Sequence, residues 1–260
     1  MRRFTMFIKN SFAKLLVANA LFVSICLQLG SGIIFISENH ALAQEGENAK
    51  TNAPFVPLVE QPDTLRRLDP IEPVWVTPDR KQVVLGGEIC LREGLLEFFA
   101  CRTRSKEHES IVALNVKPRL IHAALLVIGA KPGKPARFDP VFVPPSGEEI
   151  DIRIRWKDES GHVSDISAQE MVREAKTKKV MQVPWVFTGG LFGTDPEGKK
   201  YYLADISGEI FGVSNFPGSV LDVPFESSAN NDNLYYEPNT PKIPAVGTPV
   251  TLLLSIKKQK

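Results

Sequence analysis

The chain has 260 residues and a formal net charge of +1, and its length allows one domain or two small ones. A balance this close to neutral gives no electrostatic basis for binding nucleic acid, so we expect no such partner. All 20 prolines lie after residue 53, and this enrichment favours loops and sheet edges over a helical bundle.

The first 43 residues have the pattern of an export signal. Four basic residues accompany an apolar run over residues 15–36, and Ala41-Leu42-Ala43 supplies a cleavage site of the A-x-A type. We expect cleavage there, and therefore an exported protein of the periplasm or cell envelope. The apolar run approaches the length that spans a bilayer. A retained anchor in the inner membrane is thus the alternative, and the only membrane contact that we expect.

Residues 44–73 are Pro-rich, polar and without periodicity, which predicts a semi-extended, solvated tether. A single β-rich domain should follow over residues 74–260. Its first three strands should form an antiparallel meander, and they are predicted at residues 74–76, 82–91 and 95–101. Gly86 and Gly87, inside the second of these strands, indicate either a bulge or a close approach of another backbone segment.

Two helices are predicted among the strands. Pro118 suits the first position of a helix that ends before Gly129. Because this helix is apolar nearly all round, it should be buried against the sheet. The second helix is predicted at about residues 168–178, where Ser167 and Glu170 fit a capping box.

The clearest strand lies at residues 150–157, where isoleucines alternate with charged residues up to a tryptophan. A turn separates it from a hairpin partner at residues 163–166. Shorter strands are predicted at residues 111–115, 185–187, 201–204, 209–214 and 249–256. The predicted fold class is therefore α+β, a mostly antiparallel β-sheet with about two helices packed on it.

Six strings of this predicted domain stand out, beginning with Gly-Glu-Ile-Cys-Leu-Arg-Glu-Gly at residues 87–94. The others lie at residues 96–101, 106–110, 121–126, 213–217 and 226–232. Together they resemble the YdjY-domain family of bacterial envelope proteins, over about residues 74–256. The resemblance implies an export signal and membership of that family. It implies no activity that can be carried over to particular residues.

Two cysteines remain after the predicted cleavage, Cys90 and Cys101. An even count in an oxidising compartment favours a disulfide. The predicted hairpin opposes it, because its register separates the two cysteines by roughly 17 Å at ~3.4 Å per residue, and a disulfide needs Cα atoms within about 7 Å. We therefore expect two buried thiols that pack as small apolar side chains. A Cys90–Cys101 disulfide is the first alternative, and a redox or metal role is the second.

A metal site is the best catalytic candidate, with His108, Glu109 and His122 as its ligands. Imidazole and carboxylate groups bind zinc in hydrolytic sites, and such a site would make the protein a metal-dependent hydrolase. No H-E-x-x-H spacing links the two histidines. We therefore expect His122 to be a core residue bonded to a backbone group, and the hydrolase is kept as the alternative function.

Two polar loops are the candidate ligand-binding segments, because loops on a rigid sheet often carry binding residues. The alternative is that they are simple connections. Their candidate residues are Asn215, Phe216, Ser227, Ser228, Asn230 and Asp232.

The sequence has no motif for nucleophilic catalysis, nucleotide binding or iron–sulfur ligation, so no catalytic residue and no cofactor are expected. The sequence does not decide whether the protein is an enzyme, but the absence of catalytic motifs favours a protein that is not one. The function predicted is a non-catalytic binding domain of the cell envelope. Its partner should be another envelope protein or a cell-wall component.

Overall fold

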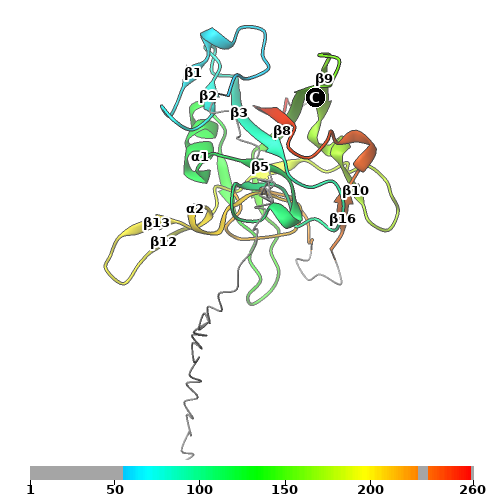
Figure 1. The fold of residues 1–260 in the computed structure, drawn as a ribbon. Helices are drawn as coiled ribbons and strands as arrows, with labels where there is room; N and C mark the ends of the chain where they lie inside the picture. Colours follow the sequence, from blue (N-terminus) through cyan, green and yellow to red (C-terminus); the bar gives the residue numbers. More distant parts are fainter. Residues whose placement is uncertain (1–54, 228–233, 259–260) are drawn as a thin grey trace, which may run out of the picture. The chain divides into compact units, whose positions relative to one another are not determined.

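The computed structural model describes residues 55–227 and 234–258 (Figure 1). All of these residues belong to one compact unit, Asn52–Lys260. The predicted export signal, residues 1–43, and the first part of the predicted tether lie outside them. Within the described ranges, no helix is both long and apolar enough to cross a membrane.

Eight strands close into a barrel. In order around the barrel they are β3 (Gln82–Ile89), β17 (Pro249–Ile256), β8 (Glu149–Lys157), β11 (Trp185–Phe187), β15 (Leu221–Asp222), β14 (Glu209–Gly212), β4 (Phe98–Arg102) and β5 (Ser110–Leu114). The pairing of β5 with β3 closes the ring. Neighbouring strands are antiparallel except for β4–β5 and β14–β15, which are parallel.

The remaining elements lie around this barrel. Three strands extend its sheet, namely β1 (Arg66–Arg67), β2 (Val74–Val76) and β9 (Val163–Ser167). Three ribbons have two strands each: β6 (Pro132–Lys134) with β7 (Ser146–Gly147), β10 (Val172–Glu174) with β16 (Tyr236–Pro238), and β12 (Phe192–Thr194) with β13 (Lys200–Tyr202). The helices are α1 (Pro118–Val127) and α2 (Leu203–Ser207), with 3-10 turns η1 (Pro62–Thr64), η2 (Glu107–Glu109), η3 (Ala168–Met171) and η5 (Thr240–Lys242).

The fold is confirmed as β-rich with two α-helices, but the predicted sheet with helices packed on it is wrong because the sheet closes on itself. Closure depends on β3, which changes partner along one edge. Residues 83–85 pair with β2, whereas residues 87–89 pair with β5. The change occurs at the two glycines. A Cβ on Gly87 would lie 2.6 Å from the Leu114 side chain, so the close approach is confirmed. The pairing of β3 with β17 continues without a bulge.

The predicted meander is confirmed for β2 and β3 only. The third strand, β4, does not pair with β3, because β5 lies between them. The turn predicted after Cys90 does not make a hairpin. Instead, the Arg92 guanidinium donates hydrogen bonds to the carbonyl oxygens of Ile243 and Thr240, and Leu96 bridges to Tyr236. These contacts direct the chain away from β3 before β4 begins.

Helix α1 begins at Pro118 as predicted, and Gly129 follows it in the left-handed conformation at φ +87°. The expectation that this helix is buried against the sheet holds for one face only. Ile121 and Leu125 are buried, whereas Leu126 and Val127 on the opposite side are exposed.

The second predicted helix, at residues 168–178, is also wrong. The capping box of Ser167 and Glu170 is present, but it begins only the 3-10 turn η3. Val172 then starts β10, which pairs with β16 and so takes the chain out of helical geometry. The second α-helix is instead α2, where the sequence pattern predicts the end of a strand.

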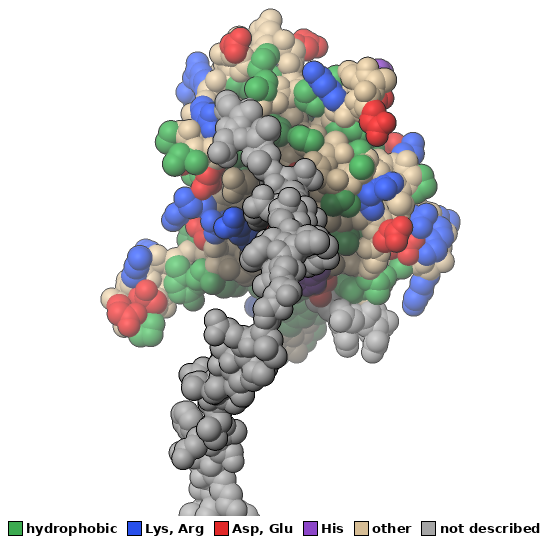
Figure 2. Space-filling model, viewed as in Figure 1, with side chains coloured by type: hydrophobic (Ala, Val, Ile, Leu, Met, Phe, Trp, Pro, Cys, Tyr) green, Lys and Arg blue, Asp and Glu red, His purple; other side chains and the backbone are tan. Residues whose placement is uncertain are grey.

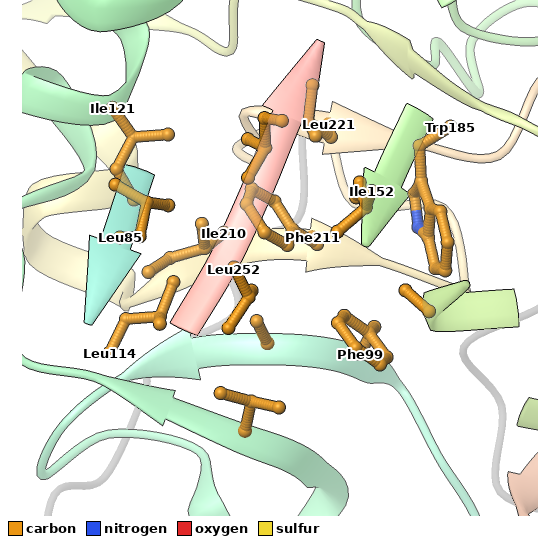
Figure 3. Packing of buried hydrophobic residues seen from close by; sticks show 14 of the residues in the cluster. Leu85, Phe99, Leu114, Ile121, Ile152, Trp185, Ile210, Phe211, Leu221 and Leu252 are labelled. Atoms are coloured by element: carbon orange, nitrogen blue, oxygen red, sulfur yellow. The ribbon is translucent and has the colours of Figure 1, made fainter. Parts of the chain in front are cut away.

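Apolar side chains from the strands fill the barrel (Figure 3). Strand β8 shows the expected alternation, with Ile150, Ile152 and Ile154 buried. Arg153 and Arg155 alternate with the isoleucines, and both donate to Asp165 on β9. Trp185 and Phe99 meet inside with ring centroids 5.4 Å apart. The alternating pattern therefore does identify the interior face of a barrel strand.

The predicted tether differs from the structure over residues 55–73, which pack against the outside of the sheet. The Phe55 ring lies over Gly86 and against Trp75, with ring centroids 6.2 Å apart. The Leu58 N–H donates to Thr251 Oγ1 at 2.9 Å, and Arg155 donates to the Leu58 carbonyl oxygen. Phe55, Val59 and Leu65 of this Pro-rich segment pack against a small cluster of Trp75, Val84 and Leu253.

Candidate functional site

The two predicted binding loops do meet, but their contact is internal. The Ser227 N–H donates to Asn215 Oδ1 at 2.7 Å, and the Asn215 N–H donates to the Ser227 carbonyl oxygen at 2.9 Å. Both residues are buried. Ser228, Asn230 and Asp232 lie outside the described residues. Asn215 and Ser227 therefore join the two loops to each other, and their polar groups are used within the protein.

A buried carboxyl group lies beneath these loops. Asp222 on β15 is fully buried, and its Oδ1 accepts from the Val223 N–H at 2.7 Å and from Asn215 Nδ2 at 3.3 Å. Within residues 55–227 and 234–258, its other oxygen, Oδ2, has no hydrogen-bond partner. Burial raises the pKa of Asp222 to about 8, against the opposing effect of its hydrogen bonds. Burial therefore favours the protonated form of Asp222.

Lys106 and three glutamates form a second polar cluster. Lys106 Nζ lies 2.8 Å from Glu109 Oε1 and 3.8 Å from Glu97 Oε2. The same ammonium group lies over the rings of Phe98 and Phe216, 5.2 Å and 5.6 Å from their centroids. Phe216, a predicted binding residue, is thus packed on Phe98 and covered by Lys106.

Burial and the neighbouring Glu109 raise the pKa of Glu97 to about 7. Burial also raises the pKa of Glu209, the third carboxyl group. For Lys106, burial lowers the pKa, but the hydrogen bond and charge of Glu109 outweigh it and raise it overall. Burial and the neighbouring carboxylate therefore favour the protonated form of Glu97.

The residues of the predicted metal site do not come together. His108 and Glu109 lie on η2, where the His108 ring is exposed. His122 lies on α1, and its Nδ1 is 3.0 Å from the Gly189 carbonyl oxygen. In residues 55–227 and 234–258, no group of three or more His, Cys, Asp and Glu side chains could hold a metal ion. Burial lowers the pKa of His122, against the opposing effect of its hydrogen bond to Gly189.

His122 is instead the centre of an aromatic cluster. Its ring makes edge contacts with Phe187, Phe192 and Tyr202, at centroid distances of 5.1, 5.6 and 5.5 Å. The Tyr202 hydroxyl donates to the Gly189 carbonyl oxygen at 3.1 Å. Gly189 adopts a φ of +85°, which brings this carbonyl group toward both side chains. The cluster fixes the base of the β12–β13 hairpin against α1.

Four large apolar side chains around this cluster remain exposed, and we call them the hairpin surface. Their exposed fractions are 63% for Phe192, 70% for Ile206, 47% for Leu126 and 38% for Leu191. They come from three elements that touch, because Arg119 of α1 pairs with Asp205 of α2 and the Leu203 N–H donates to the Leu191 carbonyl oxygen. Leu126 lies one helical turn beyond His122.

Figure 1 shows the β12–β13 hairpin projecting from the barrel beside α2. Hydrophobic side chains are visible in Figure 2 where this hairpin leaves the barrel. The hairpin surface therefore lies on the face of the molecule that carries the β12–β13 hairpin.

The two cysteines flank β5. The Cys90 N–H donates to the Ile111 carbonyl oxygen at 2.9 Å, and Cys101 is paired with Ala113. Both are free thiols, and the Cys90 thiol donates to the Ser110 carbonyl oxygen at 3.0 Å. The hairpin from which their separation was estimated is wrong, because β5 lies between β3 and β4.

Comparison with known proteins shows the family to which the chain belongs. Residues 74–255 match the YdjY domain. The chain belongs to the YdjY domain family. No curated protein and no solved structure matches the chain. The matched part of the YdjY domain runs from β2 to β17, so it contains the whole barrel, both helices and the hairpin surface.

Sequence reasoning missed the hairpin surface of this YdjY domain, although a signal was present. Leu126 and Val127 broke the amphipathic pattern of α1, and we interpreted them as buried. Phe192 lies two residues after the Gly189-Gly190 pair, between the strands predicted at residues 185–187 and 201–204. Asp222 and the cluster at Lys106 gave no pattern in the sequence, because their members come from separate elements.

Proposed function

We propose that this YdjY domain is a non-catalytic, exported domain of the bacterial envelope that binds another protein through the hairpin surface. The observation that carries the proposal is the exposure of Leu126, Phe192 and Ile206 on three touching elements. Contiguous exposed apolar side chains are uncommon on monomeric proteins and mark interaction sites. The paired charges of Arg119 and Asp205 supply a polar border.

The hairpin surface is pre-organised, which supports binding. Phe192 packs on Tyr202 at a centroid distance of 4.7 Å, and β12 is paired with β13 along its length. The His122 ring beneath is held by the Gly189 carbonyl oxygen. Aromatic side chains that are fixed before binding lose little entropy when a partner covers them.

The chemistry of the surface favours a protein over a cell-wall polymer. A sugar presents hydroxyl groups that need polar partners, whereas Leu126, Leu191, Phe192 and Ile206 offer none. Export is supported by the predicted signal at residues 1–43 and agrees with the envelope location that the family resemblance implies.

A photo-crosslinking residue in place of Phe192 should trap one discrete protein in the bacterium that carries the chain. The matched control is the same residue in place of Val246, which is 62% exposed outside the hairpin surface. Adding Ile206→Ser to the chain with the crosslinker at position 192 should reduce the product about tenfold or more, as loss of a contact worth about 2 kcal/mol does.

Equal products at both positions, or none at Phe192, would contradict the proposal. A crosslinked product that contains only this chain would identify the partner as a second copy. A product that migrates as glycan would favour the cell-wall component instead.

A further inference from the structure

A second apolar surface lies on the outside of the barrel. The strand registers place two rows of residues side by side there, across β2, β3, β17 and β8. The first row is Gly86, Thr251 and Arg155, and the second is Trp75, Val84 and Leu253. The second row forms a cluster separate from the barrel core, because alternate residues of a strand face opposite sides of its sheet. We call the residues of both rows the strap site.

Residues 55–65, which we call the strap, cover the strap site. Phe55, Val59 and Leu65 of the strap pack on the apolar row. The residues of the strap site that are buried are Trp75, Val84, Thr251 and Leu253. Since these residues face away from the barrel core, the segment that packs on them shields them from water.

Two kinds of contact hold the strap in place. The Phe55 ring lies against Gly86, where a Cβ would come within 2.6 Å of the ring. At Leu58, the backbone N–H donates to Thr251 Oγ1 at 2.9 Å, and the carbonyl oxygen accepts from Arg155 Nη1 at 3.2 Å. The first contact selects an aromatic side chain, whereas the second uses backbone groups that every residue except proline carries.

The strap is separable from the domain that it covers. The YdjY domain match begins at residue 74, so the strap site lies within the match and the strap lies outside it. Among residues 55–227 and 234–258, only Leu58 joins residues 55–59 to the sheet by hydrogen bonds. A segment with so few hydrogen bonds to the rest of a protein opens at a small cost in free energy.

We propose that the strap site binds a proline-containing apolar peptide of another protein, and that the strap occupies this site in cis and so limits access to it. The strap shows the chemistry of that peptide. An aromatic side chain lies against Gly86, and the residue three positions later is bound through its backbone. Pro57 between them is buried, and Trp75 supplies an aromatic surface of the kind to which proline-rich peptides bind. The proposal does not depend on binding at the hairpin surface.

A labelled peptide with the sequence of residues 55–65 is the probe, and fluorescence anisotropy measures its binding to the full chain. Because the strap competes with the peptide, the apparent affinity is lowered in proportion to the fraction of molecules whose strap is open. Phe55→Ala removes the ring beside Gly86 and should tighten peptide binding about tenfold or more. Val56→Ala is the matched control, since Val56 is 65% exposed, and it should bind the peptide as the wild-type chain does.

Two further variants test the strap site itself. Leu58→Pro weakens the strap at its other contact, because proline has no N–H to donate to Thr251, and it should also tighten peptide binding. Gly86→Val, added to Phe55→Ala, should abolish the gain, because the new side chain takes the place of the peptide's ring. The three atoms nearest to a Cβ at Gly86 all belong to the Phe55 ring, so this position has room for a side chain once that ring is removed.

The proposal is overturned if neither Phe55→Ala nor Leu58→Pro binds the peptide more tightly than the wild-type chain, or if Gly86→Val leaves the gain unchanged. Equal binding of a scrambled peptide of the same composition would also overturn it, since that result shows a non-specific apolar surface. A single thermal transition checks that each variant is folded. Both strap substitutions lie outside the YdjY domain, and each tests the proposal without the other.

Discussion

Replacing Trp185 with alanine should lower the free energy of unfolding by about 3–5 kcal/mol. Trp185 is fully buried in the barrel, where its ring packs on Phe99. Its Nε1–H donates to the Gly212 carbonyl oxygen at 2.7 Å, so the substitution also leaves a buried acceptor without its partner. Urea unfolding followed by circular dichroism measures the change.

Trp156→Ala is the control for this prediction. Trp156 also lies on a barrel strand, β8, but it is only half-buried. Trp156→Ala should therefore lower the free energy of unfolding by clearly less than Trp185→Ala does. Equal losses would show that the interior of the barrel is wrongly assigned.

The second large effect is a fall in stability as the pH rises from about 4 toward 8. The pKa of Asp222 is about 8 in the folded protein, above its ordinary value of 3.8, because the group is buried. Between these values the folded state holds a proton that the unfolded state releases, so stability falls with rising pH. Each unit of difference corresponds to about 1.4 kcal/mol. Glu97, with a pKa of about 7, acts in the same direction.

Asp222→Asn should remove most of this fall, because an amide is neutral at every pH and fits the same space. Urea midpoints at pH 5 and pH 8 measure it for the wild-type protein and the variant. Glu197→Gln, on the exposed β12–β13 hairpin, is the control and should keep the wild-type slope. A wild-type protein whose stability rises between pH 5 and pH 8 would contradict the assignment.

Local patterns identified most of the strands but not their partners. The alternation in β8, the proline and glycine that bound α1, and the apolar run of β17 all report the environment of neighbouring residues. The pairing of β5 between β3 and β4 is set by distant contacts, such as those of Arg92 with the chain at residues 240–243. A hairpin was the simplest interpretation, and it is wrong because β5 separates β3 from β4.

The same limit applies to the candidate sites, because a local pattern does not show which residues are buried. Asn215 and Ser227 were chosen as polar loop residues, and they do meet, but burial changes their role from binding to bracing the loops. Phe192 and Ile206 were overlooked because a single exposed apolar residue produces no periodic pattern in the sequence. Tertiary packing alone decides whether such a residue lies inside the core or on a surface that a partner can use.

The central structural claim is a closed barrel in which β5 lies between β3 and β4. Nuclear Overhauser effects between backbone protons test it most directly. We predict cross-strand contacts of Ala113 with Glu88 on one side and with Cys101 on the other. Contacts between residues 89–91 and 95–97, with none between Glu88 and Ala113, would instead show a β3–β4 hairpin and contradict the barrel.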